Sequence, residues 1–102
     1  MTPPVQASLD AARAALARND LDEARRLLEA WLAPHPDDAE AALELGMLCY
    51  VAGDTERFAA LHQAVAPQIQ ARPANRRLER LWQLSSRSFA AWSQAAALLG
   101  LS

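Results

Sequence analysis

The chain matches itself when it is shifted by 34 residues. The matches pair turn with turn and helix-forming position with helix-forming position: Asn19-Asp20 with Gly53-Asp54, Ala24 with Phe58, and Ala7 with Ala41. A period of this length is typical of chains built from repeated helical hairpins, which stack into a scaffold. We therefore expect an all-α fold that binds other molecules and is not an enzyme.

The composition agrees with a helical fold. Ala, Leu, Arg and Glu dominate, β-branched residues are sparse, and the chain has only 3 Gly among 102 residues. This length suits one small domain, 1–102, with one modest core. The single cysteine excludes an internal disulfide and suits a reducing compartment. Without a secretory signal or a membrane-spanning run, we expect a cytoplasmic protein that does not contact a membrane.

Apolar residues at helical spacing predict about six helices. We expect them from about Val5 to Arg18, from Asp20 to before Pro34, from Asp37 to Gly53, from Asp54 or Thr55 to near Pro67, from Asn75 to Leu84, and from Ser88 to Leu99. Asp20 and Asp37 are the expected N-caps of the second and third helices, and Gly53 is the expected terminator of the third. Pro67 is expected to kink or end the fourth helix, and the serine-rich stretch 85–88 to separate the last two.

These features resemble tetratricopeptide-repeat proteins. The matching residues are the pair Leu45-Gly46, the turn glycine Gly53, the small residue Ala24 and the proline Pro36. Phe58 departs from the pattern at a position that is normally small, and 34 residues after Leu45-Gly46 stand Glu79 and Arg80. The resemblance implies a right-handed stack of antiparallel hairpins, with repeats over 5–36 and 37–70 and a divergent hairpin over 74–102.

The resemblance also implies a concave surface that holds a helical or extended apolar segment of a partner protein. The first helix of each hairpin lines that surface in the family. The corresponding partner-binding residues here are Leu9, Arg13, Leu16, Leu43, Met47 and Tyr50. The alternative is that the two C-terminal helices of the same chain cover them. The expected roles are adaptor, assembly factor or chaperone, and the small size is similar to that of bacterial chaperones of secretion-apparatus subunits.

The C-terminal segment is unusually apolar. From Ser88 to Ser102 it carries no charged residue. One face of the expected last helix presents an oligomer or partner interface, formed by Phe89, Trp92, Ala96 and Leu99. A helix that is apolar nearly all round must be covered. We expect a second chain to cover it, either a partner or another copy in a homodimeric scaffold, with fold-back into the concave groove as the alternative.

No residues predict catalysis, a cofactor or a metal site. The register places Cys49 and His62 on facing helices, where a thiol–imidazole pair is geometrically possible. Both stand at core positions of the repeat, and no third group is evident to orient the histidine. The histidines and the cysteine also lack the spacing of metal ligands. A buried structural cysteine is therefore the favoured interpretation.

The charges are divided unevenly along the chain. Residues 1–56 carry 11 acidic residues and 4 arginines (−7), whereas residues 57–102 carry 6 arginines and one glutamate (+5). The second group includes Arg72, Arg76, Arg77, Arg80 and Arg87, with Trp82 and Trp92 nearby. This combination suggests phosphate binding with base stacking, but the net charge of −2 disfavours nucleic acid as the partner. An arginine face that binds acidic protein segments is the favoured reading.

Overall fold

The computed structural model describes residues 4–71 and 76–100 and is helical throughout, without a strand in those ranges. It contains five helices: α1 (Pro4–Ala17), α2 (Leu21–Leu32), α3 (Ala39–Ala52), α4 (Thr55–Ala71) and α5 (Arg76–Leu99). The all-α prediction is confirmed at this level. None of the described helices is long and apolar enough to cross a bilayer.

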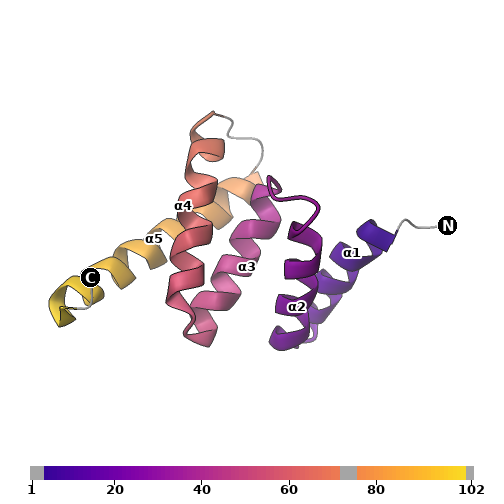
Figure 1. Ribbon diagram of the computed structural model, residues 1–102, viewed down its shortest axis with the longest axis horizontal. Coiled ribbons are helices and arrows are strands. Elements are labelled where there is room, and N and C mark those ends of the chain that lie inside the picture. The colour runs from indigo at the N-terminus through magenta and orange to yellow at the C-terminus, as the bar shows by residue number, and fades with distance from the viewer. Residues whose placement is uncertain (1–3, 72–75, 101–102) are drawn as a thin grey trace.

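The first four helices form two successive hairpins, and α5 runs across the second hairpin (Figure 1). α1 packs on α2, α3 packs on α4, and α2 joins the hairpins by packing on α3. α5 contacts both α3 and α4, and its C-terminal half extends past them (Figure 1). The molecule is consequently elongated, with principal extents of 52 × 30 × 21 Å.

The core lies along α3, which contributes more buried residues than any other described helix. This helix packs against α2, α4 and α5. The fully buried core side chains include Ala12, Ala15, Ala24, Leu28, Leu45, Cys49 and Phe58. Removal of so much apolar surface from water is the main stabilising term for a helical domain of this size.

The two turns that match at a shift of 34 residues have the same hydrogen bonds. Asn19 and Gly53 both adopt left-handed backbone, with φ of 61° and 90°. The amides of Asp20 and Asp54 each donate 2.8 Å bonds to carbonyls five residues earlier, Ala15 O and Cys49 O. Each aspartate then accepts a bond from the amide three residues later, Glu23 N and Arg57 N, as N-cap residues do.

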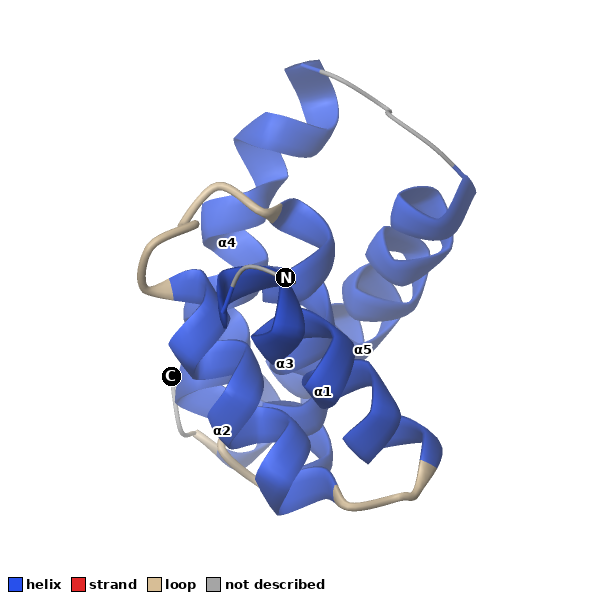
Figure 2. Ribbon diagram, turned by 90° about the vertical axis from the view of Figure 1, so that its right-hand side faces the viewer, coloured by secondary structure: helices blue, strands red, loops and turns tan. Residues whose placement is uncertain are grey.

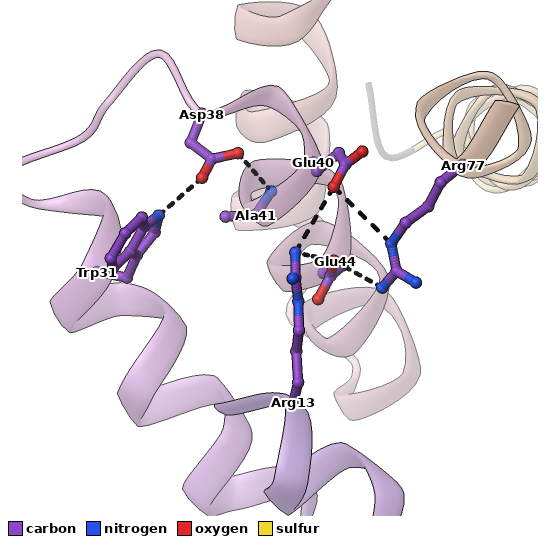
Figure 3. A network of polar contacts seen from close by, with 7 residues as sticks. All are labelled: Arg13, Trp31, Asp38, Glu40, Ala41, Glu44 and Arg77. Carbon is purple, nitrogen blue, oxygen red and sulfur yellow. Dashed lines mark hydrogen bonds and ion pairs between the residues drawn. The ribbon is translucent and has the colours of Figure 1, made fainter. Parts of the chain in front are cut away.

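The N-cap of α3 is Asp38, so the prediction that Asp37 caps this helix is wrong. One Asp38 carboxylate oxygen accepts a bond from Ala41 N at 3.2 Å, and the other accepts one from Trp31 Nε1 at 2.8 Å. The Trp31 indole comes from α2 and cannot be placed by local sequence (Figure 3). This tertiary contact favours Asp38 over its neighbour.

The break expected at 85–88 is absent, and the helices predicted over 75–84 and 88–99 are the single helix α5. Ser85 is 1% exposed, and its hydroxyl lies 2.8 Å from His62 Nδ1 of α4. A serine costs little in a helix interior when its hydroxyl has a partner, and the stretch contains no Gly or Pro. The described chain therefore has five helices, and its last turns do not fold back over α3.

Pro67 does not end α4, which continues to Ala71. Val65 before the proline is buried, and Ile69 after it packs against the core. Packing on both sides of Pro67 holds the segment helical, although proline removes one backbone hydrogen bond.

Candidate protein-binding cleft

An open apolar cleft lies between α1 and α5, with the C-terminal part of α3 as its floor. Its volume is about 320 Å³. We call it the α1–α5 cleft, and it is lined by Leu16, Leu21, Glu44, Met47, Leu48, Val51, Arg77, Leu81 and Leu84. In Figure 2 α1 faces the viewer, and the N-terminal part of α5 lies behind it and to the right. Val51 is 68% exposed and Leu84 48% exposed, so the cleft presents apolar side chains to solvent.

A four-residue ion-pair network stands at one end of the cleft and joins its walls (Figure 3). Arg13 of α1 and Arg77 of α5 reach toward two carboxylates of α3. Arg77 Nη2 lies 3.1 Å from Glu44 Oε1, and Arg13 Nη2 lies 3.6 Å from the same oxygen. Glu40 Oε2 lies 3.5 Å from Arg13 and 3.8 Å from Arg77. The network thus links α1 and α5 to the same two carboxylates of α3.

Glu44 is the buried member of that network, with its side chain 5% exposed. A buried carboxylate must be paired, and both arginines serve this purpose. The pairing leaves Glu44 Oε2 and Arg13 Nε buried without a hydrogen-bond partner among the described residues. Because Arg77 is engaged with α3, it is not a free phosphate ligand of the kind that the arginine cluster suggested.

The six predicted partner-binding residues divide into two groups. Leu16 and Met47 line the cleft, and Arg13 belongs to the network at its end. Leu43 is 1% exposed and belongs to the core, which makes it inaccessible to a partner. The Tyr50 ring packs at 4.9 Å from the Phe58 ring, and Leu9 is half-buried against the core.

Sequence reasoning missed the α5 wall of the cleft. Leu84 stands at the expected end of a separate helix, 75–84. The signal that could have found this wall is the 3–4 spacing that continues through Leu81, Leu84 and Ser88. Val51, at the exposed end of α3, was also missed.

The C-terminal apolar residues lie on two different sides of α5. Phe89 packs inward, with ring centroids 4.5 Å from His62 and 6.3 Å from Phe58. Trp92 packs at 5.7 Å on Phe89, and Ala96 is half-buried. Leu98 and Leu99 are 88% and 71% exposed. The predicted interface of Phe89, Trp92, Ala96 and Leu99 is therefore partly occupied within the chain and open at its end.

Cys49 and His62 lie in the core, and the histidine is paired with other residues. The imidazole stacks between Trp82, at 4.4 Å, and Phe89, at 4.5 Å, while its Nδ1 lies 2.8 Å from Ser85 Oγ. Burial raises the pKa of the Cys49 thiol and lowers the pKa of His62. Both shifts favour the neutral forms, whereas a thiolate–imidazolium pair requires the charged ones.

A larger hollow of about 420 Å³ lies on another part of the surface, lined by residues of α2, α3 and α4. Two of its lining residues, Glu29 and Arg57, form a 2.7 Å ion pair, and much of the remaining lining is alanine or other short side chains. It offers fewer exposed large apolar groups than the α1–α5 cleft. Over the described residues, no group of three or more His, Cys, Asp or Glu side chains is placed to hold a metal ion.

Comparisons with protein-family models, with curated proteins and with solved structures found no match to this chain.

Proposed function

We propose that this protein is a non-catalytic protein-binding module of tetratricopeptide-repeat type, and that the α1–α5 cleft holds an apolar helical segment. The observation that carries the proposal is the cleft itself, in which Val51 and Leu84 are presented to solvent beside the half-buried Met47. Apolar surface of this kind gains free energy when another apolar surface covers it.

The occupant is best matched by a helix. The cleft walls are helices, whose backbone groups are already paired, so an extended segment would find no strand edge to pair with. A helix satisfies its own backbone and contributes apolar side chains at spacings of three and four residues. A protein that holds such a segment acts as an adaptor, an assembly factor or a chaperone. The matched turn hydrogen bonds at Asp20 and Asp54 support the repeat assignment.

The test is binding of a labelled synthetic helix, uncharged and with leucines on one face, followed by fluorescence anisotropy. We expect saturable binding to the full chain at low protein concentration. Met47→Glu should weaken it by at least about tenfold, because a carboxylate in the cleft loses water when the peptide binds. The matched control, Gln68→Glu in the larger hollow, should bind as the parent does.

Equal affinities for the two variants, with both shown to be folded by circular dichroism, would reject the cleft as the binding site. Binding to neither variant nor parent would reject the proposed function.

A further inference from the structure

α5 carries a mostly apolar seam that begins in the cleft and continues to the end of the helix, with exposed leucines at Leu84 and Leu98. The seam consists of residues spaced alternately by three and four: Leu81, Leu84, Ser88, Ala91, Ala95 and Leu98. Residues with this spacing form one stripe along a helix and are the pattern of helix–helix seams. Leu78, Ser85 and Phe89 lie on a different face, toward the core.

The exposed large apolar residues of the described chain occur in two places, at the cleft and at the last turn of α5. Val51 and Leu84 line the cleft, whereas Leu98 and Leu99 stand on the last turn of α5. Figure 1 shows that turn projecting away from the other helices. Since α5 is one continuous helix, its own last turn cannot reach the cleft that its middle lines.

We propose that a second copy of this chain is the occupant of the cleft, through antiparallel pairing of the two α5 helices about a two-fold axis at Ala91. The two exposed leucines of the seam are placed symmetrically about that residue. Leu84 and Leu98 stand seven positions on either side of Ala91. In the pair, Leu84 of each copy contacts Leu98 of the other copy. This proposal rests on the proposed function, because it names the occupant of the α1–α5 cleft.

The middle of the seam suits close pairing. Ser88, Ala91 and Ala95 are small, so two helix backbones can approach there without a bulky side chain between them. The leucines at each end then cover the cleft of the opposite copy. An isologous interface of this kind is closed, because each copy uses the same surface and leaves no second site open.

The charges also fit this direction of pairing. α5 has no basic residue in its last turn to complement its carbonyl groups. Antiparallel pairing about Ala91 brings that last turn beside the N-terminal part of the other α5, where Arg80 is exposed and has no ion pair among the described residues. A cation beside a helix C-terminus is favourable. The segment 88–100 itself carries no charge that would oppose a second copy.

The test uses the full chain in sedimentation velocity and in light scattering coupled to gel filtration. We expect the chain to become dimeric as its concentration is raised to about 100 μM. Leu84→Glu and Leu98→Arg should each weaken the dimer by at least about tenfold while remaining helical, because both positions are exposed in the single chain. Ser93→Glu, a charge on the side of the same helix that faces away from the seam, should leave the dimer unchanged.

Mixing the two seam variants tests the register. Antiparallel pairing about Ala91 places the introduced carboxylate of Leu84→Glu beside the introduced guanidinium of Leu98→Arg, so the mixture should form a heterodimer. Failure of the mixture to associate would overturn the register. A monomeric parent chain, or dimers that survive both single substitutions, would overturn the self-association. If a monomeric chain still binds the synthetic helix at the cleft, the protein-binding role stands and only the second copy is excluded.

Discussion

At the scale of single residues, His62 shows how a polar side chain is accommodated in this core. Its imidazole is 8% exposed and is covered on both faces by aromatic rings, Trp82 at an interplanar angle of 3° and Phe89 at 13°. Ser85 supplies its hydrogen-bond partner from α5. His62 thus ties α4 to α5 with a neutral ring, because burial disfavours the imidazolium form.

Stability should fall as the pH is lowered through the range in which unfolded histidine takes up a proton. Burial holds the pKa of His62 below its ordinary value of 6.5. The unfolded chain therefore binds more protons than the folded chain just below that value, and the free energy of unfolding decreases as the pH falls from about 7.5 to about 5.5. Urea denaturation at the two pH values measures this change.

The controls separate His62 from the other titrating groups. His62→Asn should be less stable at both pH values and should lose most of the pH dependence in this window. His35→Asn should retain the dependence, because it keeps His62. A parent chain that is equally stable at both pH values would show that the buried histidine is not a determinant of stability.

At the scale of helices, α4 and α5 show that tertiary packing decides where an element ends. Pro67 lies within α4 at an exposed position, between Val65 and Ile69, which pack inward. Pro67 therefore disfavours the helical conformation of the segment in which it lies. The contacts of α4 with α3 and α5 offset that cost.

Pro67→Ala should stabilise the protein by about 1–3 kcal/mol, because alanine restores a backbone donor and removes the clash of the ring with the preceding turn. Thermal or urea denaturation measures the gain. Pro36→Ala, in the loop between α2 and α3, provides the comparison and should not stabilise, because it adds no helical hydrogen bond there. A loss of stability in Pro67→Ala would mean that the proline is favourable in its present conformation.

Helix starts and stops were predictable wherever the signal was local. Asp20, Asn19 and Gly53 act through their own backbone and side-chain geometry, so their positions in the sequence were sufficient. The exact N-cap of α3 and the continuity of α5 depend on Trp31 and His62, which belong to other helices. Local patterns contain no information about such contacts.

At the scale of the whole molecule, α1, α3 and α5 line a cleft because α1 packs on α2, whereas α5 packs on α3, and ion pairs link both outer helices to α3. Arg13 and Arg77 bind the same acidic pair on α3, which explains part of the charge asymmetry along the chain. The sequence predicted that α1 and α3 carry a binding surface. It misplaced Leu43, which is buried, because the repeat register fixes a helix face only to within a neighbouring residue.

The α5 wall was not predicted because the expected interruption at 85–88 divided α5 into two helices. With an interruption at 85–88, Leu84 belonged to one element and Leu98 to another. As one helix they share a stripe that reaches from the cleft to the last turn. The contrast between the buried Phe89 and the exposed Leu98 appears only in the folded chain.

The most direct test of the cleft as a receptor for an apolar helix is the methyl NMR signal of Met47. The chain has 2 methionines, and Met47 lines the cleft, so the assigned signal reports on that position. Addition of the uncharged synthetic helix to methyl-labelled protein should shift the Met47 signal progressively, together with the methyl signals of Val51 and Leu84. The signals of Leu61 and Val65, in the larger hollow, should remain in place. Shifts at Leu61 and Val65 with an unmoved Met47 would contradict the account.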